Sequence, residues 1–199
     1  MWPTGTTVYN PVTREWGRLV ESPADNGGAY IKAELLAQPT AHVAGPHYHP
    51  TQEEKFEVVS GELHYRLGDT TGVIGPGEQV TVPPGAHHDW WNASDTVCNA
   101  FVTVTPAGRF HEMIGAVWGL AVLGRTTDYG APKPLDGILL AEAFSDEVVF
   151  LKPPPAVQKV MARVAAPLVR ATGRSVTSDE VQEASLVAPE SWPASQSRA

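Results

Sequence analysis

The 199-residue sequence has few of the residues that would mark several common protein classes. Cys98 is the only cysteine, so neither an intrachain disulfide nor a cysteine-based zinc cluster can form. Lys and Arg number 14 against 22 Asp and Glu, and the formal charge of −8 leaves no basic face for nucleic-acid phosphates. The composition therefore disfavours a disulfide scaffold, a cysteine zinc finger and a general nucleic-acid binder.

Long apolar runs are missing as well. The longest is Met113–Gly124, with twelve residues, whereas a helix needs about 20 to span a bilayer. The first residues, MWPTGTTVYNP, have neither the basic region nor the apolar region of a secretory signal. We therefore expect a soluble, cytoplasmic protein that does not bind membranes.

Turn-forming residues are abundant instead, with 18 Gly and 18 Pro. They separate short segments of strand-like composition, at intervals typical of a β-sandwich or β-barrel. These segments are Ala29–Ala37, Glu54–Val59, Glu62–Gly68, Glu78–Pro83 and Asp95–Pro106. The pattern predicts an all-β domain over residues 1–106.

After Pro106 the pattern becomes helical. Apolar residues recur every three or four positions from Phe110, and again in Leu135–Phe144 and Ala156–Arg170. Pro167 is expected to kink or end the last of these helices. Residues 107–171 are thus predicted to form a helical extension that packs on the β-domain or builds a dimer interface. Residues 172–199, rich in Ser, Ala, Glu and Pro, are expected to be a flexible tail.

A pair of histidines stands out in Gly45–Ser60, GPHYHPTQEEKFEVVS. On an extended strand, His47 and His49 leave the same face, and two imidazoles so placed suit a transition metal. Glu54 shares its parity with the apolar Phe56 and points into the interior, whereas Glu53 is expected in solvent. On its own such a pair more often belongs to a polar surface loop than to a metal site.

A second stretch, Gly77–Asn92, shifts the balance towards a metal site. In GEQVTVPPGAHHDWWN an apolar strand ends in a Pro-Pro-Gly turn and is followed by His88. Trp90 shares the parity of His88, whereas His87 should point the other way. Two separate strand–turn units therefore each deliver histidine from an apolar strand.

Together these stretches resemble the two signature motifs of the cupin superfamily. The first motif, two histidines followed by glutamate and glycine, is matched by His47, His49, Glu54 and Gly61. The second is matched at every position by Gly77, Pro83, Gly85, His88 and Asn92. The one departure lies before the first motif, where Ala41 replaces the usual glycine, and we expect Gly45 to serve that turn instead.

The resemblance implies a cupin jelly-roll barrel (a double-stranded β-helix) with C-terminal α-helices. It also implies one divalent transition metal, which is iron, manganese, nickel, copper or zinc, held by His47, His49, Glu54 and His88. Such a site would keep open positions for a small-molecule substrate. Small cupins often form dimers, so a homodimer is compatible with the resemblance.

The expected function is a metal-dependent oxidoreductase similar to quercetinase-like dioxygenases, in which Glu54 is both a metal ligand and the catalytic base. Strand parity predicts a substrate pocket partly lined by Phe56, Val58, Tyr65 and Trp90. Two alternatives stay open. One is a cupin whose metal acts without redox chemistry, as an isomerase, lyase or cyclase, and the other is a ligand-binding cupin with no enzymatic activity.

Overall fold

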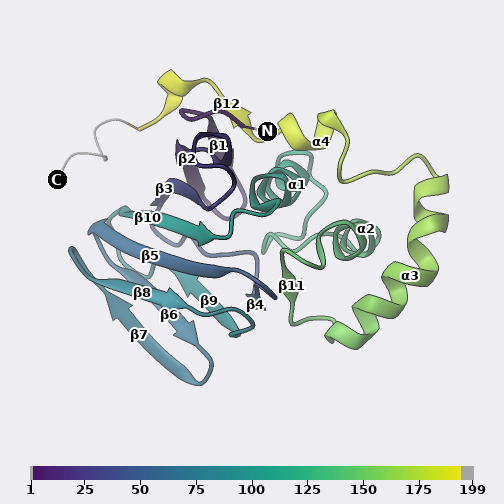
Figure 1. The fold of residues 1–199 in the computed structure, drawn as a ribbon, viewed down its shortest axis with the longest axis horizontal. Helices are drawn as coiled ribbons and strands as arrows, with labels where there is room; N and C mark the ends of the chain where they lie inside the picture. Colours follow the sequence, from purple (N-terminus) through teal and green to yellow (C-terminus); the bar gives the residue numbers. More distant parts are fainter. Residues whose placement is uncertain (1, 194–199) are drawn as a thin grey trace.

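Two antiparallel sheets dominate the computed structural model, which describes residues 2–193 (Figure 1). The seven-stranded sheet has the order β12 (Leu186–Val187), β1 (Thr7–Asn10), β2 (Glu15–Glu21), β3 (Ile31–Ala37), β10 (Cys98–Thr105), β5 (Glu53–Ser60) and β8 (Gln79–Val82). The five-stranded sheet has the order β11 (Val149–Phe150), β4 (His47–Tyr48), β9 (His88–Trp91), β6 (Leu63–Leu67) and β7 (Thr70–Ile74). Two short 3-10 helices, η1 (Pro23–Asp25) and η2 (Pro189–Ser191), lie outside the sheets. The predicted all-β jelly roll with C-terminal helices is thereby confirmed.

The inner faces of the two sheets pack against each other because apolar residues alternate along the strands. Phe56 and Val58 on β5 are buried, as are Leu63 on β6 and Trp90 on β9, and all four belong to one hydrophobic cluster. This cluster is the core of the barrel.

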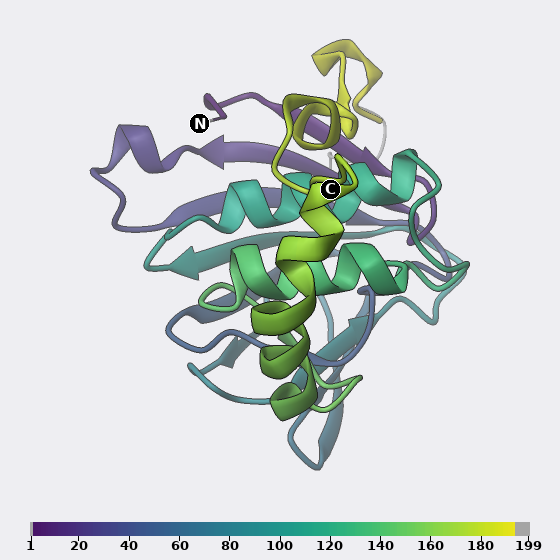
Figure 2. The ribbon, with the colours of Figure 1, turned by 90° about the vertical axis from the view of Figure 1, so that its right-hand side faces the viewer.

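Three long helices form a second layer beside the barrel, and a short one packs against the first of them. They are α1 (Phe110–Val122), α2 (Pro134–Phe144), α3 (Pro155–Ala171) and the short α4 (Asp179–Glu183). Figure 2 shows α3 crossing in front of α1 and α2, so α1 is enclosed between the barrel and the other helices. None of the helices among residues 2–193 is long and apolar enough to cross a membrane.

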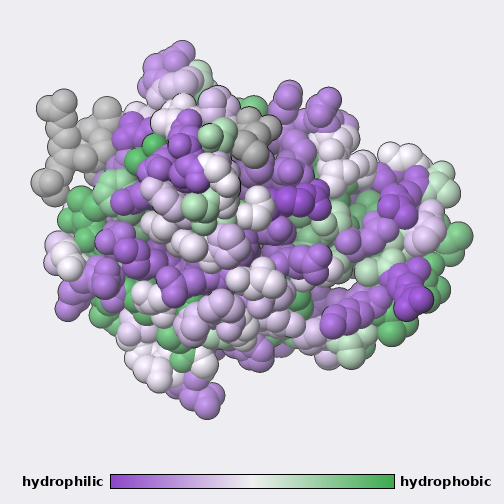
Figure 3. Space-filling model, viewed as in Figure 1, coloured by the Kyte–Doolittle hydropathy of each residue, from purple (hydrophilic) through white to green (hydrophobic). Residues whose placement is uncertain are grey.

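Pro167 lies inside α3 and does not end it, so of the two expected effects only a kink stays a prediction. Pro167 is exposed, so the carbonyl that loses its hydrogen-bond partner can bond to water. The outward face of α3 carries four exposed apolar side chains, visible as green patches along the right-hand edge of Figure 3. They are Val157, Val160, Val164 and Leu168.

The expected flexible tail is not what the structure has between residues 172 and 193. Strand β12 pairs with β1, with Leu186 opposite Val8, and Val181 of α4 is completely buried. The approach of α4 to α1 depends on Gly119, because a Cβ added there would lie 1.8 Å from the Val181 carbonyl oxygen. Residues 194–199, the rest of the expected tail, lie outside the described residues.

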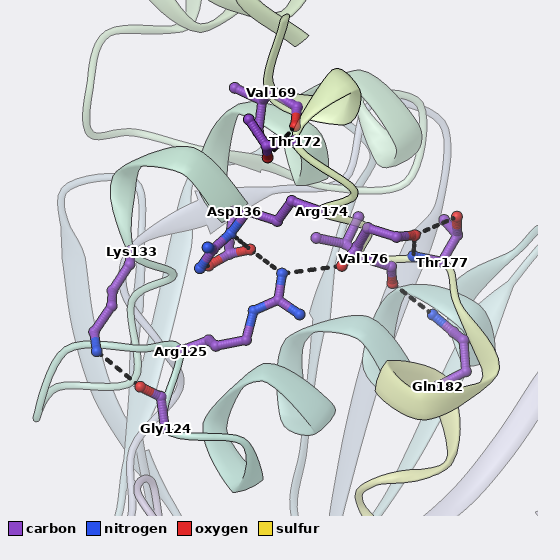
Figure 4. A network of polar contacts seen from close by, with 11 residues as sticks. Gly124, Arg125, Lys133, Asp136, Val169, Thr172, Arg174, Val176, Thr177 and Gln182 are labelled. Atoms are coloured by element: carbon purple, nitrogen blue, oxygen red, sulfur yellow. Dashed lines mark hydrogen bonds and ion pairs between the residues drawn. The ribbon is translucent and has the colours of Figure 1, made fainter. Parts of the chain in front are cut away.

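A buried carboxylate ties this C-terminal segment to the helical layer (Figure 4). Asp136 on α2 is fully buried and forms ion pairs with Arg125 and with Arg174, the latter at 2.7 Å. Arg125 also donates to the backbone carbonyl of Ser175 at 3.0 Å. Burial alone would raise the pKa of Asp136, but the hydrogen bonds from Arg174 and Arg125 outweigh it and lower the pKa.

Candidate metal centre

Four side chains from the two sheets converge between them. His47 on β4 is the register partner of His88 on β9, His49 follows β4 directly, and Glu54 reaches in from β5 of the opposite sheet. One ligand atom from each of these residues lies within 4.8 Å of the others. None of the four is more than 6% exposed. Side chains that the chain separates by up to 41 positions therefore form one buried cluster.

The orientation of each imidazole is set by a backbone carbonyl. The Nδ1 atoms of His47, His49 and His88 lie 3.0, 2.6 and 3.1 Å from the carbonyl oxygens of Gly45, Glu147 and Ala86. A carbonyl only accepts hydrogen bonds, so Nδ1 carries the proton and Nε2 presents a lone pair. Gly45 adopts a φ of +132°, so it provides the turn that the sequence assigned to it.

The Nε2 atoms face the carboxylate of Glu54. Nε2 of His88 lies 3.0 Å from Oε2 of Glu54, and Nε2 of His49 lies 3.7 Å from the same oxygen. Among residues 2–193, the Nε2 atom of His49 is buried without a hydrogen-bond partner. Lone pairs and a carboxylate repel one another unless a cation lies between them. The donor set and the unpartnered nitrogen therefore fit a bound metal ion.

The electrostatics of the cluster lead to the same conclusion. Burial would raise the pKa of Glu54, but the neighbouring His49 and His88 hold it well below its ordinary value. Burial, together with the nearby His88 and His49, lowers the pKa of His47 to about 3. Burial also opposes charge on His49, yet the neighbouring Glu54 overcomes it and raises the His49 pKa. The cluster thus favours positive charge beside Glu54, as a cation site does.

The neighbouring polar residues lie away from the cluster. Glu53 is exposed, and His87 is exposed with its ring 5.4 Å from that of Tyr48. Trp91 stacks on His64 at 5.8 Å, on the side of the sheet opposite Trp90. Asn92 is buried and donates to the carbonyls of Ala37 and Thr96, so it holds the turn after β9.

The cluster borders a cavity of about 130 Å³ between the seven-stranded sheet and α1. His47, His49 and Glu54 line it, together with Phe56 and Trp90 of the predicted pocket. Most of the remaining wall is aromatic or aliphatic and was not foreseen from the sequence. It includes Trp2, Phe110, Met113, Trp118 and Phe150, and also the polar Glu15 and His111.

Two residues of the predicted pocket are not among those that line the cavity. Val58 shares the parity of Phe56 but lies two positions further along β5, where it is buried in the barrel core. The ring of Tyr65 instead covers Gly72 on the neighbouring strand β7. Parity identifies the inner face of a strand but not how far along it the cavity extends.

A wider cleft of about 840 Å³ separates the five-stranded sheet from α2 and α3. His88 lines this cleft, and Ala44, Val148 and Phe150 line both the cleft and the inner cavity. The cluster therefore lies between a small apolar cavity and a larger cleft.

Comparison with known proteins places the four-residue cluster in a recognised domain. A profile described as the cupin domain matches residues 34–105. An oxidoreductase of Arthrobotrys oligospora is 41% identical over 98 residues, a match that covers 43% of this chain and 39% of that protein. The chain thus spans about two-fifths of the length of that curated relative.

Solved structures with similar folds overlap about half of this chain. The polyketide cyclase RemF from Streptomyces resistomycificus is 26% identical with a TM-score of 0.41, over 46% of this chain and 64% of that chain. A predicted oxalate decarboxylase from Thermotoga maritima is 19% identical with a TM-score of 0.43, over 46% and 80% of the two chains. From the profile match, the two sheets and both histidine motifs, we conclude that residues 34–105 of the chain form a cupin domain.

Proposed function

We propose that the chain is a metal-dependent oxidoreductase of the dioxygenase type that acts on a small, largely apolar organic molecule. The observation that carries this proposal is the buried cluster of three histidines and one glutamate in the wall of an apolar cavity. Four protein ligands leave room for further ligands on most transition metals. The oxidoreductase name of the A. oligospora relative supports the same class.

The four side chains have separable tasks in this proposal. A divalent metal held by these residues would supply a Lewis acid for a substrate oxygen and, if it were iron, copper, nickel or manganese, a centre able to exchange electrons. The carbonyls of Gly45, Ala86 and Glu147 keep the imidazoles oriented. Glu54, held ionised by its neighbours, is the group that accepts a proton from a substrate hydroxyl. The apolar walls exclude bulk water from that transfer.

The size of the cavity limits the substrate. Drug-sized ligands occupy pockets of roughly 300–1,000 Å³, whereas an apolar cavity of about 150 Å³ accommodates a molecule of the size of benzene. A cavity of about 130 Å³ therefore favours a molecule with a single ring or a short chain. The aromatic walls favour a flat one.

The test begins with the metal content of the purified protein and of protein reloaded with iron, manganese, nickel, copper or zinc. Oxygen uptake is then measured with single-ring phenols and 1,3-dicarbonyl compounds. We expect bound metal and oxygen consumption in the wild type. We expect loss of most metal in His49→Ala and Glu54→Ala but not in the matched controls His87→Ala and Glu53→Ala, which change exposed neighbours.

The outcomes separate the alternatives. A zinc-loaded protein that transforms a substrate without consuming oxygen would favour an isomerase, lyase or cyclase over an oxidoreductase. A protein that retains no metal under any loading condition would exclude both enzymatic functions. The homodimer and the cytoplasmic location remain predictions.

A further inference from the structure

Glu15 has a buried carboxyl group that borders the same cavity but does not belong to the cluster of three histidines and Glu54. It lies on β2, is 4% exposed, and shares the inner face of that strand with Gly17 and Leu19. Charged side chains are almost never buried so completely unless they are paired. A carboxyl group at this position therefore calls for a partner.

Among the described residues, a hydrogen-bond partner is found for one of the two carboxyl oxygens of Glu15. The hydroxyl of Thr13, itself fully buried, donates to Oε2 of Glu15 and has no other acceptor among residues 2–193. Oε1 of Glu15 has no hydrogen-bond partner in the same part of the chain. Arg18 also borders the cavity and could in principle pair with Glu15, but it forms its ion pair with Glu34. Glu34 also accepts a hydrogen bond from Asn99.

Glu15 is consequently a neutral acid near neutral pH. Burial raises its pKa to about 8, the bond from Thr13 opposes that rise, and the charge of Glu54 adds to it. The other ionisable groups along the cavity are His47, His49, His111 and the Arg18–Glu34 pair. Because Thr13 already donates to Oε2, the proton of the acid is available at Oε1 for an acceptor in the cavity.

The wall next to Glu15 suits a ring. Gly17 leaves space on β2 for the indole of Trp118, since a Cβ at residue 17 would lie 3.3 Å from Trp118 Cη2. Trp118 also lines the cavity, so a flat aromatic surface and the carboxyl group border the same space. A planar ligand held against this surface would lie in the cavity that Glu15, His47, His49 and Glu54 also line.

We propose that Glu15 is a specificity-determining residue, which donates a hydrogen bond to a substrate oxygen remote from the one bound at the metal. The site would then select single-ring molecules that carry oxygens at two separate positions, of which the remote one is an acceptor. This inference rests on the proposed function for the metal-bound anchor of the substrate.

The test uses matched probes on zinc-loaded protein. The probes are 2′-hydroxyacetophenones, which chelate the metal through two adjacent oxygens. Each probe carries, at the 4′ or 5′ position, either a methoxy group or an ethyl group of similar size. For at least one position, the wild type should bind the methoxy probe about 3- to 10-fold more tightly than the ethyl probe, the gain expected from one hydrogen bond. Glu15→Leu should abolish this ratio and leave the affinity for the ethyl probe within about twofold of the wild type.

Glu15→Gln keeps the shape and a donor, and it serves if Glu15→Leu does not fold. Its methoxy-to-ethyl ratio should persist at pH 9, whereas the wild-type ratio should disappear there because an ionised carboxylate has no proton to donate. Zinc content is measured first. A wild-type protein that holds no metal overturns the proposed function, whereas a metal-loaded protein with the same probe ratio in wild type and Glu15→Leu overturns the role of Glu15 alone.

Discussion

Gln52 links the four-residue cluster to the helical extension through hydrogen bonds. Replacing Gln52 tests whether this link matters for metal binding. Its side chain is 1% exposed and donates to Oε2 of Glu147 at 2.8 Å and to the carbonyls of Pro106 and Ala107 at 3.2 and 3.3 Å. Glu147 in turn offers its backbone carbonyl to Nδ1 of His49 at 2.6 Å. Gln52→Leu removes the donor without leaving a large cavity, so it should loosen the segment that orients His49.

The magnitude follows from what the variant loses and what it keeps. Hydrogen bonds to a charged group are worth about 1.5–3 kcal/mol, and Glu147 is buried but keeps a second bond from the Arg109 amide at 2.9 Å. We therefore expect the metal-free variant to lose about 2 kcal/mol of unfolding free energy. Loss of outer partners of a metal ligand typically lowers affinity about 10- to 100-fold. The pairing of β11 with β4 still holds the carbonyl nearby, so we expect about tenfold.

Two measurements separate stability from metal binding. Urea unfolding of the metal-free protein gives the change in free energy, and competition with a zinc indicator gives the affinity. Gln79→Leu is the matched control, because it makes the same substitution at an exposed position on β8. A folded Gln52→Leu protein with wild-type zinc affinity would refute the argument that Glu147 orients His49, and so would an equal loss of affinity in Gln79→Leu.

Two further predictions concern stability. Asp136→Asn removes the charge that pairs with Arg125 and Arg174 and should cost about 3 kcal/mol in urea unfolding at pH 7. Because the pKa of Asp136 is lowered from 3.8, its stabilisation is present above that pH and disappears as pH falls through the folded-state pKa, so the wild type and the variant should converge in acid. Gly61→Ala should be more destabilising than Gly77→Ala. Both residues have positive φ, but only at Gly61 would the added Cβ meet backbone, 2.5 Å from the Val97 carbonyl oxygen. We expect about 3 kcal/mol or more for Gly61→Ala and about 1 kcal/mol for Gly77→Ala, and equal values would contradict the steric explanation.

Strand alternation explains why the positions of the four clustered residues could be anticipated from the sequence. Which side of a strand a residue occupies is a local property, so Glu54 could be separated from Glu53, and His88 from His87. The choice of these four residues as one set came from the resemblance to the two cupin motifs. The helices α1, α2 and α3 were predictable for a similar reason, since each has a run of apolar residues with helical spacing.

The N-terminal strands were missed because their inward positions do not hold the expected apolar residues. On β2 these positions are Glu15, Gly17 and Leu19, so the alternation that marks a buried strand is hidden by the carboxyl group and by the glycine that accommodates Trp118. Strands β11 and β12 have two residues each, too few for any periodicity. Both owe their existence to pairing with a distant strand rather than to local pattern.

Residues outside the cupin domain contribute to the site as well. The profile match ends at residue 105 and begins at residue 34, and it contains all four clustered residues. Yet the acceptor that orients His49 belongs to Glu147, and the cavity wall depends on Trp118 and Phe150 from the helical extension and on Glu15 from the N-terminal strands. A relative that shares only the matched domain would share the metal ligands without sharing this cavity. The four clustered residues therefore come from the matched domain, whereas much of the cavity wall beside them comes from the segments on either side of it.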